Sequence, residues 1–290
     1  MTPRRSDSSR EPSQLTTVIP TKNEEIHIER CVRSALELGR VIVVDAFSED
    51  RTVEIARGLG ADVFQQAWLG HAAQKNWALA NTNIDTPWVL ILDADEWLVE
   101  DTRQRIAATI GVGGASGYYL PRRNVFLGRE LRHAWWYPDF QLRLFRAGSA
   151  RYEDRLVHEH MIVDGRVEEL WADLWHENRK SLHEFIERHN RYSTLEAAEI
   201  VDPSSVERQG SLRGNWADRR RALKLRVWLR IPGRPVIRFF WLYVVKRGFL
   251  DGRVGFLYCL LIAFYDLMIG AKVYELRHPL KPLGDPHSSP

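Results

Sequence analysis

Two carboxylates follow directly after an apolar run in the first half of this sequence. The run Val89–Leu92 has the pattern of a buried strand, and Asp93 and Asp95 come at its end, separated by one alanine. Carboxylates at a strand end can reach into a cleft without burying their charges deeply. Their oxygens suit Mg²⁺ or Mn²⁺, hard cations that also bind phosphates. The pair indicates a metal–phosphate site, and a solvated acidic turn is the alternative reading.

Polar groups also follow two earlier apolar runs. Pro20 and the residues up to Glu25 come after the run that begins at Leu15, and Asp45 ends the run Val41–Val44. In open α/β sheets, ligands bind outside the carboxyl ends of the strands. We expect Asp45 to accept hydrogen bonds from a base or ribose, or else to act as a turn residue or helix cap. The helix start after Pro20 could meet an anionic or heterocyclic ligand.

The elements that position these groups alternate between strand and helix patterns. The expected strands are Leu15–Ile19, Val41–Val44, Ala61–Phe64 and Trp88–Leu92. Three helices are expected. The first is capped by Asn23, the second begins at Ser48 or Asp50, and the third covers His71–Ala80. This rhythm predicts a Rossmann-like α/β domain, with a mostly parallel sheet and helices on both faces. Later patterns are less regular, with strands expected at Gly117–Leu120 and Gln141–Phe145 and a polar helix at Leu182–Ile200.

Four segments together resemble inverting family 2 glycosyltransferases with a GT-A fold. They are TVIPTKNEE (17–25), VVDAFSEDRT (43–52), AAQKNWAL (72–79) and LDADE (92–96). YPDFQLRLFR (137–146) and VHEH (157–160) resemble the branch that contains lipopolysaccharide core glucosyltransferases and relatives acting on surface glycans. The resemblance covers roughly residues 15–161. It implies transfer of a sugar, glucose by family analogy, from a UDP-sugar donor to a lipopolysaccharide-core or other lipid-linked glycan acceptor.

The resemblance also implies roles for individual residues. Those that would bind the nucleotide are Pro20, Thr21, Glu24, Asp45, Lys75 and Asp93. Asp93 and Asp95 would hold a divalent metal, Mg²⁺ or Mn²⁺, against the diphosphate, with Asp95 the more direct ligand. His158 could be a third ligand of the metal or the diphosphate. For Lys75, an exposed position on a helix is the alternative.

The acceptor hydroxyl needs a carboxylate to take its proton. The Glu-Asp pair that marks this base in many relatives is absent from the chain. Asp139, in the aromatic loop before the strand at Gln141–Phe145, is the favoured base, and Glu159 is its competitor. Arg143 either contacts phosphate or lies on a solvated strand face.

The C-terminal part combines cations with apolar residues. Between Ser211 and Val254 there are twelve Lys and Arg against two Asp, in a chain whose net charge is only +3. The apolar stretches Val236–Val245 and Val254–Ala271 interrupt or follow this basic part. Such a combination is typical of segments that lie on an anionic membrane surface. Val254–Ala271 is close to the roughly 20 residues that a span needs, but it contains Asp266. We therefore favour a monotopic anchor, with ordinary core helices as the alternative.

We expect three regions: a disordered leader (1–14), a catalytic GT-A domain (15–200) and a basic, amphipathic helical region (201–290). The two distant cysteines, Cys31 and Cys259, and the polar N-terminus favour a cytoplasmic protein, peripheral on the inner face of the cell membrane. Transfer to polyprenyl phosphate or protein is a second enzymatic hypothesis. A nucleic-acid-binding protein or a non-catalytic membrane scaffold is the hypothesis of another class. No nucleic acid partner is expected, because the cations are mixed with an apolar tail.

Overall fold

The computed structural model describes residues 14–134, 137–153, 161–202, 231 and 233–278. The chain divides into two compact units, residues 1–179 and 180–290. The boundary lies before helix α5 (Leu182–Val201), not at the expected position after residue 200. The reason is that α5 packs on α9 (Gly252–Arg277), where the Tyr265 hydroxyl donates to Glu196 Oε1 at 2.8 Å. Nearly all of the expected leader lies outside the described residues.

A ten-stranded mixed sheet forms the centre of the first unit. Its main path has the order β3-β2-β1-β4-β8-β6-β12-β5. The parallel part consists of β1 (Leu15–Thr21), β2 (Arg40–Asp45), β3 (Asp62–Gln65) and β4 (Trp88–Ile91). The other strands on the path are β5 (Glu96–Leu98), β6 (Gly117–Phe126), β8 (Asp139–Arg146) and β12 (Leu174–Glu177).

Shorter strands extend this framework. Both β7 (Arg129–Leu131) and β11 (Val167–Glu169) pair with β6. A separate small sheet pairs β9 (Ala150–Tyr152) with β10 (Met161–Val163). The expected strand at Gly117–Leu120 is therefore only the first part of β6, because partners on both sides of β6 prolong it.

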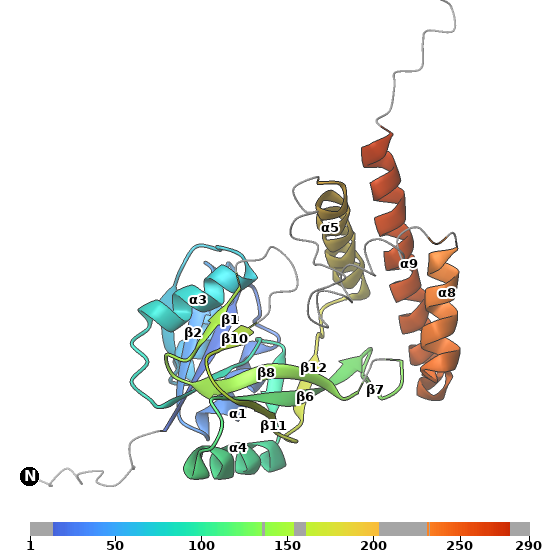
Figure 1. The fold of residues 1–290 in the computed structure, drawn as a ribbon. Coiled ribbons are helices and arrows are strands. Elements are labelled where there is room, and N and C mark those ends of the chain that lie inside the picture. The colour runs from blue at the N-terminus through green and yellow to red at the C-terminus, as the bar shows by residue number, and fades with distance from the viewer. Residues whose placement is uncertain (1–13, 135–136, 154–160, 203–230, 232, 279–290) are drawn as a thin grey trace, which may run out of the picture. The chain divides into compact units, whose positions relative to one another are not determined.

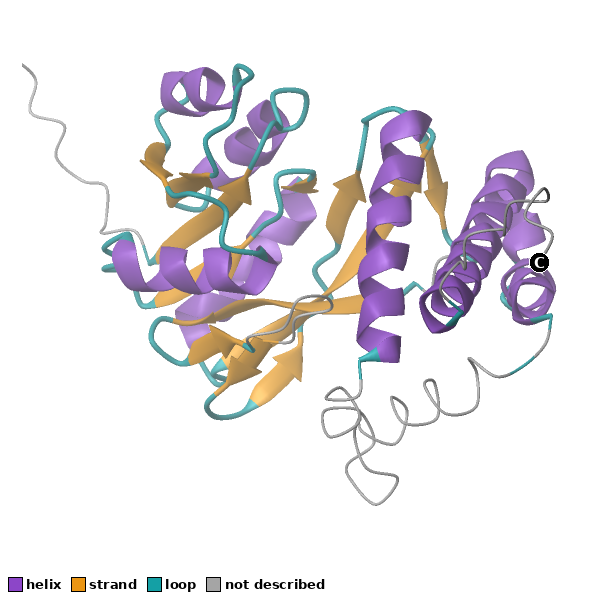
Figure 2. Ribbon diagram, turned by 90° about the horizontal axis from the view of Figure 1, so that it is seen from above, coloured by secondary structure: helices purple, strands orange, loops and turns teal. Residues whose placement is uncertain are grey.

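Alternating apolar residues give the sheet two buried faces, each covered by helix. Val18 and Val89 belong to one cluster, which includes Ala78 of α3 (His71–Asn81). Leu15 and Leu90 belong to the other cluster. That second cluster includes residues of α1 (Ile28–Leu36), α2 (Thr52–Gly58) and α4 (Glu100–Val112). Helices thus lie on both sides of the strands (Figures 1 and 2), which confirms the expected fold class.

The first helix begins later than the sequence suggests. Asn23 does not cap it; α1 begins at Ile28, and Asn23 has a positive φ of 53°. Its side-chain oxygen accepts a hydrogen bond from Glu49 N at 2.9 Å, and its backbone N donates to Ser48 Oγ at 2.8 Å. The prediction was wrong because Asn23 bonds to the loop after β2, which ties two loops together at the edge of the sheet.

The second unit is helical in its described part. Beside α5 and α9 it contains α8 (Arg234–Phe240), a π-helical turn η2 (Trp241–Val245) and a 3₁₀ turn η3 (Gly248–Asp251). These elements confirm helix at both expected apolar stretches. The stretch Gly248–Arg277 is the one helix in the described residues that is long and apolar enough to cross a membrane. Most of the basic run before α8 lies outside the described residues.

Candidate active site

The carboxyl ends of β1 and β2 are joined by a buried polar turn. Thr21 pairs in register with Asp45, and Ala46 N donates to Thr21 O at 2.9 Å. The Asp45 side chain is completely buried. Its carboxylate accepts from Ser48 N at 2.9 Å and is also bonded by the Ser48 hydroxyl and, at 3.4 Å, by Gln65 Nε2. Asp45 thus has the turn role that the sequence left as an alternative to ligand contact.

The other three residues predicted at this end of the sheet lie on β1 or in the loop that follows it. Thr21 is buried, and among the described residues its hydroxyl has no hydrogen-bond partner. Glu24 Oε2 lies 2.6 Å from His27 Nδ1, and Pro20 is half-buried. A buried hydroxyl without a partner costs free energy unless something bonds to it. Thr21 is therefore the strongest ligand-binding candidate among these three.

Asp93 lies between two cations from other elements. Lys75 on α3 approaches it with Nζ 3.2 Å from Oδ1, and Arg143 on β8 with Nη2 2.6 Å from Oδ2. Burial alone would raise the pKa of Asp93, but Arg143 and Lys75 outweigh burial and hold it well below its usual value. Lys75 is itself buried, so the reading as an exposed helix lysine is wrong. Arg143 is buried too and does not lie on a solvated face.

The ion pairs continue from Arg143 to the predicted base. Arg143 Nη2 also lies 2.6 Å from Oε1 of the buried Glu96, whose other oxygen accepts from Asp93 N at 2.9 Å. Burial, aided by the charge of Asp93, raises the pKa of Glu96 although Arg143 opposes the shift. Arg122 Nη1 lies 3.7 Å from Glu96 Oε1, and Arg122 Nη2 donates to Asp139 Oδ2 at 2.8 Å. Charges alternate along this "charge chain", which runs from Lys75 to Asp139.

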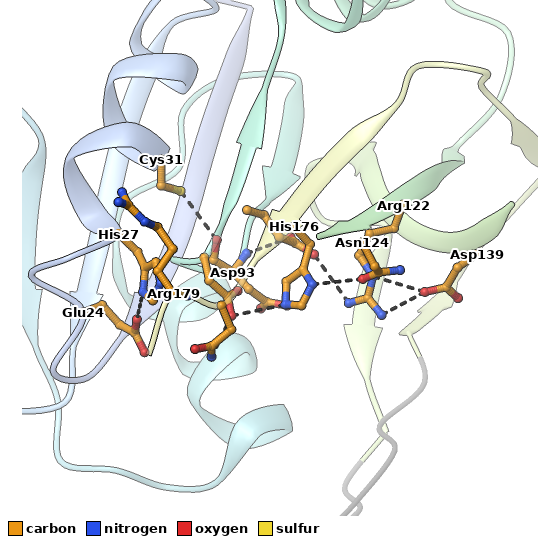
Figure 3. A network of polar contacts seen from close by, with 12 residues as sticks. Glu24, His27, Cys31, Asp93, Arg122, Asn124, Asp139, His176 and Arg179 are labelled. Carbon is orange, nitrogen blue, oxygen red and sulfur yellow. Dashed lines mark hydrogen bonds and ion pairs between the residues drawn. The ribbon is translucent and has the colours of Figure 1, made fainter. Parts of the chain in front are cut away.

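Asp95 contacts a histidine that the sequence did not identify. His176 on β12 has Nε2 3.2 Å from Asp95 Oδ2, and its Nδ1 lies 2.9 Å from Asn124 Oδ1 (Figure 3). Since an amide oxygen only accepts, Nδ1 donates to Asn124, and Nε2 faces the carboxylate, to which it donates when the ring carries a second proton. Burial would raise the pKa of Asp95, but His176 outweighs burial and lowers it.

His176 and Asp95 are far apart in the sequence and meet through strand pairing. In β12, His176 lies opposite Asn124 of β6 on one side and Glu96 of β5 on the other. The sequence carried one weak signal, a histidine and Asn178 at the end of a short apolar segment. No spacing rule connects that segment with Asp95.

The donor atoms near Asp95 suit a divalent cation in part. Asp95 offers carboxylate oxygens and His176 an imidazole nitrogen, a pair suited to Mn²⁺ and similar ions. Asn124 fixes the imidazole ring in the way that outer partners fix metal-binding histidines. In the part of the chain that is described, no three His, Cys, Asp or Glu side chains come together as a metal site. The residues fit an ion held by two protein ligands and completed by substrate oxygens.

Two predicted residues cannot be placed, and a third has clear neighbours. His158 and Glu159 lie outside the described residues. Asp139 is at the start of β8, where Arg122 donates to Oδ2 and Gln141 Nε2 donates to Oδ1 at 2.9 Å. The structure therefore connects Asp139 to Asp93 through the charge chain and leaves Glu159 without a position.

The chain is similar to known proteins in both sequence and structure. The family model described as glycosyl transferase family 2 matches residues 16–160. The lipopolysaccharide core biosynthesis glycosyltransferase LpsC of Rhizobium meliloti (strain 1021) is 28% identical over 92% of this chain and 94% of its own. An uncharacterized glycosyltransferase, RT0209 of Rickettsia typhi, is 28% identical over 91% of this chain and 87% of its own.

A solved structure shares the fold. Mannosyltransferase PcManGT from Pyrobaculum calidifontis, in complex with GDP-Man and Mn²⁺, superposes with a TM-score of 0.52 at 12% identity. The match covers 92% of this chain and 89% of that one. At this identity the likeness concerns the GT-A arrangement of sheet and helices and not the ligands.

Proposed function

The chain belongs to glycosyl transferase family 2, and on this premise we propose that it transfers a sugar from a UDP-sugar to a lipopolysaccharide-core or other lipid-linked glycan. The activity as a glycosyltransferase follows from the family. The acceptor class is supported by LpsC, a lipopolysaccharide core biosynthesis glycosyltransferase that matches over nearly the whole length of both chains. Glucose as the transferred sugar is suggested by the family resemblance.

The donor nucleotide occupies the carboxyl end of β1 and β2 in this proposal. Thr21 bonds to the nucleoside through its unpartnered hydroxyl, beside Pro20 and Glu24. Asp45 holds the turn that shapes this pocket, because its oxygens are already engaged by Ser48. Lys75 and Arg143 give the neighbouring diphosphate a positive environment around Asp93. Preorganised cations of this kind stabilise the negative charge that grows on a leaving diphosphate.

Asp95 and His176 would hold Mg²⁺ or Mn²⁺ in this site. The ion would supply positive charge to the leaving diphosphate. Asp93, predicted as a ligand as well, has its carboxylate oriented by Lys75 and Arg143. We therefore assign Asp93 to positioning the donor and its ion, and Asp95 to direct coordination. The geometry of Asp95, His176 and Asn124 is the observation that carries this assignment.

Asp139 serves as the base in this mechanism. It accepts the proton of the acceptor hydroxyl while the oxygen attacks the anomeric carbon from the face opposite the diphosphate. The new glycosidic bond forms as the sugar–phosphate bond breaks, so the anomeric configuration inverts. Arg122 and Gln141 fix the carboxylate for this step. Glu159 stays the competing candidate for this role.

Calorimetric titration with UDP, with and without Mn²⁺, tests the proposal. We expect binding that Mn²⁺ strengthens, and loss of the Mn²⁺ effect in Asp95→Ala and in His176→Ala. Matched controls are Asp101→Ala, an exposed acid on α4, and His183→Ala, an exposed histidine on α5. No UDP binding by the folded wild type would overturn the proposal. Product analysis then separates a lipid-linked glycan acceptor from polyprenyl phosphate and from protein.

The cell location is part of the same proposal. We place the protein on the cytoplasmic face of the cell membrane, where nucleotide sugars and lipid-linked acceptors meet. The apolar helix Gly248–Arg277 supports an association with membrane.

A further inference from the structure

Exposed apolar side chains form a continuous line on α9. The five residues that define this "apolar stripe" are Phe256, Leu257, Leu260, Phe264 and Leu267, each exposed by 41–51%. At about 100° per residue, these positions fall within an arc of about 100°. Buried residues of α9 such as Tyr258 and Ile269 point away from this arc. Within the described residues, protein therefore covers the opposite side of α9 and leaves the apolar stripe largely exposed.

Neighbouring helices of the same unit pack on the N-terminal edge of the apolar stripe and on other parts of α9. Phe239 of α8 and Tyr243 of η2 pack on the Phe256 ring at centroid distances of 5.7 and 5.6 Å. Arg234, at the start of α8, bonds to the backbone oxygen of Asp266. These contacts make α8 antiparallel to α9, as Figure 1 shows. Further along α9, Glu196 of α5 bonds to Tyr265.

Helix α8 and η2, which pack beside α9, also expose apolar side chains. These are Val236, Ile237, Phe240, Trp241, Val244 and Val245. Together with the apolar stripe they exceed the scattered apolar side chains of an ordinary soluble surface. A surface of this kind binds either protein or the acyl region of a membrane.

The charges around this surface favour an anionic membrane. Arg247 and Arg253 are exposed at the turn between η2 and α9, with Lys246 beside them, and Arg253 falls within the arc of the apolar stripe. The one acid in this turn, Asp251, is buried. Cations next to an apolar face are attracted to the headgroups of anionic lipids.

Helix α5 argues against α9 crossing the bilayer. Lys272 of α9 donates to Asn190, Ser193 and Thr194 of α5 at 2.6–2.8 Å, so the two helices are joined along the C-terminal half of α9. The charged residues that α5 exposes are Glu184, Glu187, Arg191 and Glu199. A crossing α9 would carry these charges into the hydrocarbon, where ionised side chains are very unfavourable.

From these contacts we infer that α9 and α8 bind in the plane of an anionic membrane, with the apolar stripe in the boundary between headgroups and acyl chains. Both helices enter one leaflet only, and neither helix crosses the bilayer. α5 stays on the aqueous side, where its charges are solvated. This inference names the membrane-binding surface of the proposed enzyme, but it rests on the second unit alone and not on the proposed chemistry.

Vesicle flotation of the full chain tests the surface. The probes are phosphatidylcholine vesicles with and without phosphatidylglycerol. The double variant Leu260→Gln, Phe264→Gln should bind anionic vesicles about tenfold more weakly than wild type. Its matched control is Ile186→Gln, Leu195→Gln, two apolar residues of α5 exposed by 40% and 45%. The inference is overturned if wild type does not bind, if the control loses as much binding, or if the stripe variant only abolishes dimers.

A labelling experiment tests the orientation. Arg247→Cys and Arg277→Cys place a reactive thiol at either end of α9, and the two native cysteines are buried. In sealed inverted membrane vesicles, a membrane-impermeant maleimide should label both positions from outside. Labelling of one position only would mean that α9 crosses the membrane and would overturn the in-plane arrangement. Asp95→Ala should bind vesicles as wild type does. Membrane binding is therefore tested independently of the proposed enzymatic function.

Discussion

The two units of this protein differ in how far they bury their large apolar side chains. The twelve largest fully buried side chains are all apolar and all belong to the first unit. In the described residues, the second unit exposes eighteen large apolar side chains and the first only eight, although the first has more residues. Both units bury charged side chains, such as Glu96 and Arg143 in the first and Glu196 and Arg234 in the second.

This difference agrees with the two proposed ligands, a charged sugar donor for the first unit and a membrane for the second. The first unit gathers charges at one edge of a sheet, where buried ion pairs fix them for work on a charged substrate. The second unit exposes the apolar stripe of α9, which suits the apolar interior of a membrane. The buried charges of the first unit already have partners in the charge chain, whereas the apolar area that the second unit exposes to water is unfavourable until a matching partner binds.

The largest expected effect is on catalysis. Asp95→Ala should lower kcat/KM by about 10³-fold, because in the proposed mechanism this carboxylate would hold the ion that stabilises the leaving diphosphate. Initial rates with UDP-sugar and a lipid-linked acceptor measure it. Asp101→Ala serves as the control and should stay within about twofold of wild type. Full activity of Asp95→Ala would contradict the assignment of the active site to this edge of the sheet.

A second effect concerns the stability of the first unit. Arg143→Met leaves the buried Glu96 and the half-buried Asp93 without their shared cation, and should lower the free energy of unfolding by about 3 kcal/mol at pH 7, mostly through Glu96. Urea unfolding measures it. The exposed Arg151→Met is the control, since Arg151 lies 3.9 Å from the exposed Asp164.

The same variant has an expected pH dependence. The pKa of Asp93 is held low, so its charge stabilises the fold above about pH 4, and this contribution is lost as the pH falls through the lowered pKa. Since Arg143→Met removes the main cause of the lowering, its deficit against wild type should shrink on acidification from about pH 5 to about pH 3, where the Asp93 charge is lost. A deficit that is constant over this range would contradict the role of the ion pair.

A smaller effect should appear inside the second unit. Lys272→Met removes the hydrogen bonds that join α9 to Asn190, Ser193 and Thr194 of α5. We expect a loss of about 1–2 kcal/mol in local stability. Faster hydrogen exchange in α5, with β1–β4 unchanged, would be the signature. Arg277→Met on the same helix is the control, and equal exchange in both variants would contradict the contact.

The smallest effect sharpens the contrast between the units. Leu260→Gln or Phe264→Gln should change the free energy of unfolding in solution by no more than about 0.5 kcal/mol, because these side chains are already exposed. Leu90→Ala, at a fully buried position of the first unit, should cost about 2–5 kcal/mol. A large loss in the α9 variants would mean that the apolar stripe is covered by protein.

Most of the parallel sheet could be predicted from the sequence. Short apolar runs that end in a polar residue located β1, β2 and β4, and helical spacing located α3 within a residue. The cap at Asn23 could not be predicted correctly, because Ser48 and Glu49 compete for its hydrogen bonds from a different loop. Likewise, the sequence pattern of α5 gave no sign that it packs on α9 and belongs to the second unit.

For the active site, the sequence by itself determined the carboxylates. Asp93 and Asp95 are adjacent to a strand, so local pattern was enough to mark them, and the family motifs added Lys75 and Asp139. Only the tertiary structure brought His176 to Asp95 and placed Arg143 between Asp93 and Glu96. The physical reason is that strand pairing joins residues far apart along the chain, and no local spacing records which strands will be neighbours.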